Sequence, residues 1–328
     1  MSIGLSEIEA ARARIAGTIR ETPVEPSRHL SALTGQPVHL KLEHHQRSGS
    51  FKLRGAANAI LRLSDEEKAC GVVAVSTGNH GRGVARAARE NGVRAVVAMS
   101  KLVPQNKVDA IRAEGAEVII TGRSQDEAQV EADRLAEAGM VMIPPFDHPD
   151  IIAGQGTLGL EIVEAMPDVA CVLVQLSGGG LIAGVAAAVK ALRPQTRIVG
   201  VSMERGAAMH ASLAAGRPVS VEELPTLADS LGGGIGLNNR HTFEMVRALV
   251  DGVVLLSEAE IAAAIRHAYF EERQIVEGSG AVGIGALLTG KVAPEGPTMV
   301  VLSGGNIDMR LHHRLIAGET VDVAAEAA

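Results

Sequence analysis

Short apolar segments alternate with amphipathic segments along most of this chain, and this alternation limits the possible folds more than any other feature. Segments 72–75, 95–99 and 117–120 are rich in Val, Ile and Ala, and helical patterns at 78–91 and 105–114 separate them. Strands that are apolar along most of their length are typical of parallel sheets with helices on both faces. The sequence therefore predicts an α/β fold built on parallel sheets.

The alternation is interrupted near Pro144-Pro145 and resumes after residue 169. A chain of 328 residues is long enough for two domains. We therefore expect a large domain formed by residues 1–71 and 147–328, with a small α/β domain, residues 72–146, inserted into it.

Composition argues against several classes of protein. The net charge is −7, Trp is absent and there is a single Tyr, so the chain lacks the basic and aromatic surface typical of nucleic-acid binders. No apolar run approaches the roughly 20 residues that span a bilayer, and the N-terminus carries no secretory pattern. We expect a cytoplasmic protein with no membrane or nucleic-acid partner.

The segment SGSFKLRG at residues 48–55 places a lysine, Lys52, at the expected start of a helix. Burial and neighbouring cations lower the pKa of an ammonium group, so a lysine in such a position can act as a nucleophile or a base. Lys52 is therefore the first candidate for a catalytic residue.

Three polar, glycine-rich loops, at residues 76–81, 177–180 and 303–306, follow segments that we expect to be strands. In open α/β sheets, ligands bind at the carboxyl ends of parallel strands, and glycine allows backbone N–H groups to surround an anion. Turn geometry also explains each loop taken alone. Three such loops together with a reactive lysine predict a phosphorylated cofactor with a reactive carbonyl group.

Two other patterns do not indicate a site. Residues 154–159 match G-x-G-x-x-G, but no expected strand precedes them and no acidic residue follows at the distance that a dinucleotide site requires. The pairs His44-His45 and His312-His313 lack the spacing of zinc ligands, and we expect them on the solvated surface. We assign no metal ligand.

Taken together, these motifs resemble the fold-type II pyridoxal-phosphate enzymes, in particular the group of threonine/serine dehydratases and serine racemases. The resemblance covers nearly the whole chain. It is carried, in family order, by segments 50–56, 76–81, 154–157, 178–181 and 303–306. It implies two open, twisted parallel-sheet domains of the tryptophan synthase beta-like fold, with pyridoxal 5'-phosphate in the cleft between them. Thr77 and segment 42–46 also resemble dehydratases of hydroxyectoine utilisation.

The resemblance implies a role for each cofactor-binding residue. Lys52 would hold the cofactor as a Schiff base, and Phe51 would pack on the pyridine ring. Asn79 would bind the ring hydroxyl oxygen, and Ser303 would face the ring nitrogen. The backbone N–H groups that would bind the phosphate belong to Gly178, Gly179, Gly180 and Leu181.

The resemblance also implies the catalytic and substrate-binding residues. Lys52 would move the Cα proton. Thr77 stands where racemases of this group carry a serine that acts as a second acid/base. Ser76, Thr77 and His80 would line the pocket for the substrate carboxylate.

Four residues depart from the family pattern. Ser177 replaces a glycine of the phosphate loop, and Ser230 replaces a glycine near the cofactor. Ser202 replaces a glutamate that helps to hold a divalent ion in many relatives, which puts a metal site in doubt. Ala128 lies near the position of an arginine that binds a second carboxylate in a β-hydroxyaspartate-active relative, which weakens the case for an acidic substrate.

The implied function is that of a pyridoxal-phosphate-dependent dehydratase, or ammonia-lyase, which converts a β-hydroxy amino acid to a 2-oxo acid and ammonia by α,β-elimination. Serine, threonine, β-hydroxyaspartate and a hydroxylated diaminobutyrate derived from hydroxyectoine are all candidate substrates, and the sequence does not separate them. An amino-acid racemase on the same fold and a non-catalytic cofactor- or phosphate-binding protein are the alternatives. Since this group is commonly dimeric, a homodimer is expected.

Overall fold

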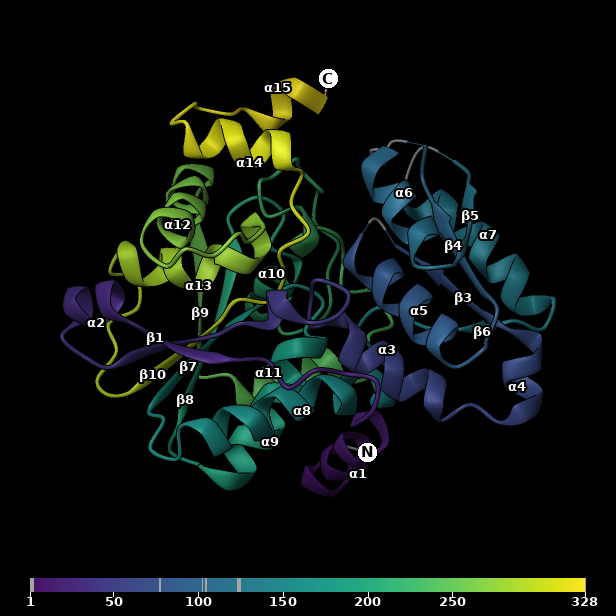
Figure 1. Cartoon of the computed structure of the whole chain (residues 1–328), viewed down its shortest axis with the longest axis horizontal. Helices are drawn as coiled ribbons and strands as arrows, with labels where there is room; N and C mark the ends of the chain where they lie inside the picture. The colour runs from purple at the N-terminus through teal and green to yellow at the C-terminus, as the bar shows by residue number, and fades with distance from the viewer. Residues whose placement is uncertain (1–2, 77, 102, 104, 123–124, 328) are drawn as a thin grey trace.

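Two sheets organise the chain, and their helices cover both faces of each (Figure 1). The computed structural model describes residues 3–327 except 77, 102, 104 and 123–124. The larger sheet has six strands in the order β1-β2-β10-β7-β8-β9, and the smaller has four in the order β5-β4-β3-β6. The predicted α/β fold is confirmed.

The large sheet is parallel except at one edge, where β1 pairs antiparallel with β2. Its strands are β1 (Val24–Ser27), β2 (Val38–Lys41), β7 (Cys171–Gln175), β8 (Arg197–Met203), β9 (Gly252–Leu256) and β10 (Thr298–Val301). The helices that pack on one face are α1 (Leu5–Ile15), α8 (Pro149–Ala165), α9 (Gly180–Leu192), α10 (Ala208–Ala215) and α11 (Thr242–Leu249). Those on the other face are α2 (Arg28–Thr34), α12 (Glu258–Phe270), α13 (Gly278–Leu288) and α14 (Met309–Ile316).

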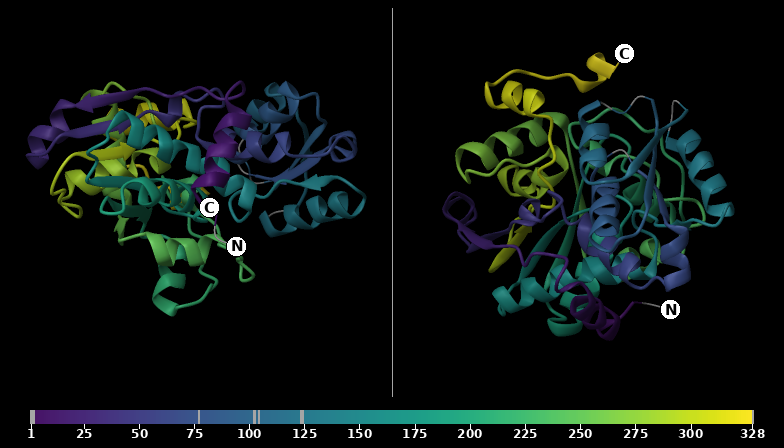
Figure 2. Two further views of the ribbon diagram at one scale, coloured as in Figure 1. Left: turned by 90° about the horizontal axis from the view of Figure 1, so that it is seen from below. Right: turned by 45° about the vertical axis from the view of Figure 1, so that its right-hand side comes forward.

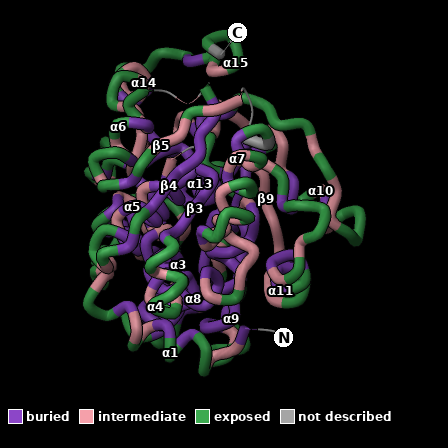
Figure 3. Tube along the Cα trace, turned by 90° about the vertical axis from the view of Figure 1, so that its right-hand side faces the viewer, coloured by how far each residue is buried: buried purple, intermediate pink, exposed green. Residues whose placement is uncertain are grey.

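The small sheet is parallel throughout. Its strands are β3 (Val72–Val75), β4 (Ala95–Met99), β5 (Glu117–Ile120) and β6 (Val141–Met142). Packed on one face are α3 (Lys52–Leu61), α5 (Asn79–Glu90) and α6 (Gln105–Ala113), with α7 (Gln125–Glu137) on the other. Strands β3 and β4 are buried along their whole length (Figure 3), which is why both faces of the strand sequences are apolar.

Short elements complete the chain: α4 (Asp65–Cys70), α15 (Val323–Ala327) and the 3₁₀ turns η1 (Glu43–His45) and η2 (Asp229–Leu231). The unit built on the small sheet lies beside the rest of the molecule in Figure 1 and in the left-hand view of Figure 2. All four strands of that sheet fall between residues 72 and 142. The domain boundaries at 71/72 and 146/147 stay a prediction.

The glycine motif at residues 154–159 lies within α8, a long buried helix that the sequence analysis did not identify. A side chain on Gly154 would come within 2.6 Å of the Arg54 carbonyl oxygen on α3. A side chain on Gly159 would come within 2.8 Å of the Val185 carbonyl oxygen on α9. The glycines therefore let α8 pack closely against two neighbouring helices.

One expectation about the surface is wrong. His44 and His312, which we expected on the solvated surface, are 8% and 1% exposed. His44 lies in η1 (Glu43–His45), and its N–H donates to the Leu302 carbonyl oxygen just after β10. His312 lies in α14, and its ring contacts the Tyr269 ring on α12. Among the described residues, no helix has both the length and the apolar character needed to cross a bilayer.

Candidate active site

Four helices begin at the wall of one cavity of about 520 Å³, a volume that includes the space opening to solvent. Lys52 starts α3, Asn79 starts α5, Gly180 starts α9, and Ser279 lies in the first turn of α13, and all four residues line the cavity. Helix N-termini carry free N–H groups and a partial positive charge. Their convergence therefore favours an anionic ligand.

Lys52 is confirmed at the start of a helix, and its amine lies inside the cavity. Its Nζ donates a hydrogen bond to the Pro145 carbonyl oxygen at 2.8 Å and lies 5.4 Å from the centre of the Phe51 ring. Desolvation by the surrounding protein lowers the pKa of Lys52 to about 8. About a tenth of the amine is therefore neutral, and so nucleophilic, at pH 7, far more than for an ordinary lysine.

The loop before α9 forms another part of the cavity wall. Gly178, Gly179, Gly180 and Leu181 all line it, together with Ser177. Gly179 has a φ of 90°, which favours glycine. A side chain on Gly178 would come within 2.3 Å of the Phe146 ring, so only glycine fits between that ring and the cavity. The loop thus has the form of an anion cradle ahead of a helix N-terminus.

Asn79 joins the two units of the molecule across the cavity. Its Nδ2 donates to Glu277 Oε1 at 2.6 Å and to Ser230 Oγ at 3.3 Å. Its Oδ1 accepts from Asn306 Nδ2 at 2.6 Å, and Asn306 in turn accepts from Arg82 on α5. Asn79 is therefore held rigidly at the position from which it would meet a ligand.

Ser303 follows β10 and lines the cavity beside Phe51. The backbone N–H of Phe51 donates to the Ser303 carbonyl oxygen at 3.0 Å, so the segment before Lys52 is tied to the end of β10. The structure thus brings together the eight residues for which we predicted cofactor contacts. They are Phe51, Lys52, Asn79, Gly178, Gly179, Gly180, Leu181 and Ser303.

The predicted substrate residues are placed differently. Ser76 Oγ accepts hydrogen bonds from the N–H groups of Gly78 and Gly81, and so caps its own loop. His80 Nε2 donates to the Ile143 carbonyl oxygen at 2.8 Å. Neither side chain is among those that line the cavity. Thr77 lies outside the described residues, and the role of all three at a substrate carboxylate stays a prediction.

His80 is neutral at physiological pH. Burial and the nearby positive charge of Lys52 lower its pKa to about 3, against the opposing effect of the Ile143 hydrogen bond. The ring therefore stays uncharged, and its hydrogen bond to the Ile143 carbonyl oxygen holds the loop in position.

Three polar residues of the cavity were missed by the sequence analysis: Glu277, Gln175 and Ser279. Burial, followed by the negative charge of Asp229, raises the pKa of Glu277 to about 7, although its hydrogen bond from Asn79 opposes this shift. A polar residue at the end of a buried strand, and polar residues just before an apolar helix, are signals that could have marked these positions. Only the fold shows that they converge.

The four departures from the family pattern fall at different places. Ser177 and Ser230 line the cavity, so both replacements alter its wall. Ala128 is buried in the core between α7 and the small sheet and does not line it. Ser202 is buried on β8 and contacts the Met203 sulfur.

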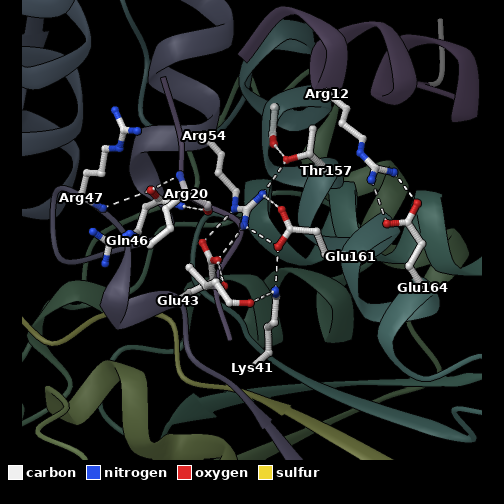
Figure 4. A network of polar contacts seen from close by, with 12 residues as sticks. Arg12, Arg20, Lys41, Glu43, Gln46, Arg47, Arg54, Thr157, Glu161 and Glu164 are labelled. Atoms are coloured by element: carbon white, nitrogen blue, oxygen red, sulfur yellow. Dashed lines mark hydrogen bonds and ion pairs between the residues drawn. The ribbon is translucent and has the colours of Figure 1, made fainter. Parts of the chain in front are cut away.

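A buried network of charges surrounds Arg54, which follows Lys52 by two residues on α3 (Figure 4). Arg54 is fully buried and makes five hydrogen bonds, to Glu43, Thr157 and Glu161. Lys41 Nζ lies 2.6 Å from Glu161 Oε2. Burial would raise the pKa of Glu43, but the charge and hydrogen bonds of Arg54 outweigh it and lower that pKa. The network fixes the first turn of α3, which also carries Lys52.

A model of a family described as "Pyridoxal-phosphate dependent enzyme" matches residues 15–304 of this chain. The chain belongs to this family. The site fits the cofactor, because one cavity is lined both by an amine with a lowered pKa and by a glycine-rich helix N-terminus that suits a phosphate. The predicted cofactor, pyridoxal 5'-phosphate, and the predicted enzyme class are confirmed.

Two named relatives match almost the whole chain. It is 65% identical over 319 residues to a Sinorhizobium fredii protein named "Putative threonine dehydratase", which covers 97% of this chain and 96% of that protein. It is 42% identical over 315 residues to the L-threonine ammonia-lyase of Thermotoga maritima, over 96% of this chain and 78% of that protein.

Among solved structures, maize serine racemase superposes with a TM-score of 0.91 at 34% identity, covering 97% of this chain and 98% of that one. The predicted resemblance to threonine/serine dehydratases and serine racemases is thereby confirmed. The fold-type II architecture that the resemblance implied is confirmed by the same superposition.

Proposed function

We propose that this protein is a dehydratase that eliminates water from a β-hydroxy amino acid and releases a 2-oxo acid and ammonia. The observation that carries the proposal is that the Lys52 amine, with a pKa lowered to about 8, shares one cavity with the 178–181 loop. The relatives named as threonine dehydratase and L-threonine ammonia-lyase support the same reaction class.

In this proposal each residue of the chain has a defined task. The N–H groups before and within the first turn of α9 bind the cofactor phosphate, and Phe51 packs on its ring. Asn79 meets the ring hydroxyl and Ser303 the ring nitrogen. Pyridoxal phosphate, once bound, supplies an electron-withdrawing ring that delocalises the negative charge left at the substrate Cα. The Lys52 amine takes the proton from Cα as a general base.

The first turn of α5 is the proposed site for the substrate carboxylate. The partial positive charge at the start of this helix suits an anion, although the Gly81 N–H already donates to Ser76 Oγ. Ser76 Oγ is bonded to the backbone of its own loop and His80 Nε2 to the Ile143 carbonyl oxygen, so we assign both side chains to shaping the loop. We assign Thr77 to contact with the substrate.

We propose threonine and serine as the first substrates to test, and the hydroxylated diaminobutyrate from hydroxyectoine as a narrower possibility. We also propose the small domain of residues 72–146 as the part that borders the substrate, and a homodimer in the cytoplasm as the working state. A keto-acid release assay over both diastereomers of each β-hydroxy amino acid tests the activity.

The second candidate is an amino-acid racemase, favoured by the superposition on maize serine racemase. Polarimetry run beside the keto-acid assay separates the two. Loss of optical rotation without keto acid would replace the dehydratase with the racemase. A protein that binds the cofactor but changes no amino acid in either assay would support the non-catalytic alternative.

A further inference from the structure

Two of the residues that line the cavity each carry a buried polar atom without a hydrogen-bond partner. The two atoms are Oε1 of Gln175, which is 4% exposed, and Oγ of Ser279, which is 1% exposed. The other such atoms among the described residues belong to side chains that do not line it. Since buried polar groups are nearly always paired in folded proteins, these two atoms indicate a ligand that supplies the missing partners.

The orientation of the Gln175 amide is fixed by its own nitrogen. Nε2 donates to the Val301 carbonyl oxygen at 2.6 Å and to the Gly280 carbonyl oxygen at 3.1 Å. A flipped amide would place its oxygen against two carbonyl oxygens, which would repel it. Oε1 is therefore the amide atom left without a partner, and it can only accept a hydrogen bond.

Three segments bring Gln175, Ser279 and Ser303 to the same end of the cavity. Gln175 closes β7, and its bond to Val301 ties it to β10 two residues before Ser303. Ser279 lies in the first turn of α13, and a side chain on the next residue, Gly280, would come within 2.4 Å of the Gly304 carbonyl oxygen. The helix thus packs directly against the loop that carries Ser303.

We propose that Gln175 and Ser279 form, with Ser303, a polar group that holds the ring-nitrogen end of the cofactor. The Gln175 carbonyl oxygen can accept a hydrogen bond, and each hydroxyl can donate or accept one. The three side chains together therefore offer the ring-nitrogen end both donors and acceptors. The proposal rests on the cofactor site described above and is independent of the substrate and reaction class.

The test is cofactor affinity, measured by titrating the apo-protein with pyridoxal phosphate in the absence of any amino acid. Ser279→Ala is expected to raise the dissociation constant about 3- to 10-fold, the effect of one lost hydrogen bond. The melting temperature of the apo-protein should not fall, because the hydroxyl has no partner there. The absorbance maximum of the bound cofactor should also shift.

Ser50→Ala is the matched control, since Ser50 Oγ is another buried atom without a partner but does not line the cavity. It should leave affinity and absorbance unchanged. Gln175→Met is the second variant and should weaken binding and shift the absorbance in the same direction. Unchanged affinity and absorbance in Ser279→Ala would overturn the proposal, even if the lyase activity were proved. Full affinity in Ser279→Ala together with no activity on any amino acid would count against both proposals separately.

Discussion

Helix α3 separates two polar regions that differ in how their charges are satisfied. Lys52 and Arg54 are two residues apart, so their side chains project about 200° apart around the helix. Arg54 enters a network in which all five of its N–H hydrogens have protein partners. Lys52 faces a cavity where Gln175 Oε1 and Ser279 Oγ have none.

This difference separates what holds the site from what performs the reaction. In the network of Lys41, Glu43, Arg54 and Glu161, two positive charges are balanced by two negative ones. These four groups are paired with one another and do not require a ligand. The cavity contains an amine with a lowered pKa and two side chains with unpaired polar atoms. Such groups destabilise the cofactor-free protein and are available to bind a ligand. Substitutions on the two sides of α3 should therefore affect different quantities.

The largest expected effect is on the cavity side. Lys52→Ala should lower kcat by about 10³-fold or more, because it removes the proposed general base and cofactor anchor. The free energy of unfolding of the apo-protein should change by less than about 1 kcal/mol, since Lys52 has a single hydrogen bond to a carbonyl oxygen. Lys101→Ala, on an exposed residue, is the control for both measurements. Retained activity in Lys52→Ala would refute the assignment.

On the network side the effect should fall on stability. Arg54→Met removes the cation from buried Glu43 and leaves Glu161 with Lys41 alone, and it should lower the free energy of unfolding by about 3–5 kcal/mol. Arg12→Met breaks the exposed ion pair with Glu164 (Figure 4) and should cost less than about 1 kcal/mol. Urea denaturation of both variants measures this contrast. Equal losses in the two would show that burial of the network has no special weight.

The pKa of Lys52 predicts how cofactor uptake depends on pH. Only the neutral amine reacts, so the rate at which the apo-protein takes up pyridoxal phosphate should rise about tenfold per pH unit below pH 8. It should level off above about pH 8, where the amine is mostly neutral. Stopped-flow absorbance at a series of pH values measures this rate. A rate still rising tenfold per unit at pH 9–10 would indicate an ordinary solvated lysine.

A smaller effect is expected at the phosphate loop. Gly178→Ala would force the Phe146 ring away and disturb the cradle, and we expect about tenfold weaker cofactor binding. Gly17→Ala is the control, because a side chain there meets no atom within 4 Å. Equal cofactor affinity in the two variants would show that the loop tolerates a side chain and does not need to approach the phosphate.

The features that sequence could predict are local ones. Lys52 at a helix start and the glycine loop before α9 are each recognisable within a few residues, and both were placed correctly. Helix α8 was missed because its glycines lower helix propensity, whereas close packing against α3 and α9 stabilises it in the fold. Edge strand β1 was also missed, since only its partner β2 gives it a sheet to join.

Residues whose role depends on convergence were not accessible in this way. Glu277, Gln175 and Ser279 come from separate elements, and nothing near each in the chain shows that the three meet. Conversely, Ser76 and His80 lie in the expected loop but do not line the cavity, because Ser76 Oγ bonds to the loop's own backbone and His80 Nε2 to the distant Ile143 carbonyl oxygen. Such competition between a loop's own backbone and a ligand is decided in three dimensions.

The most direct test of the account is to reduce the holoenzyme with borohydride, digest it and locate the cofactor by mass spectrometry. The account predicts one modified peptide, with the cofactor mass on Lys52. Modification of any other lysine, or none at all in a protein that retains its activity, would contradict it.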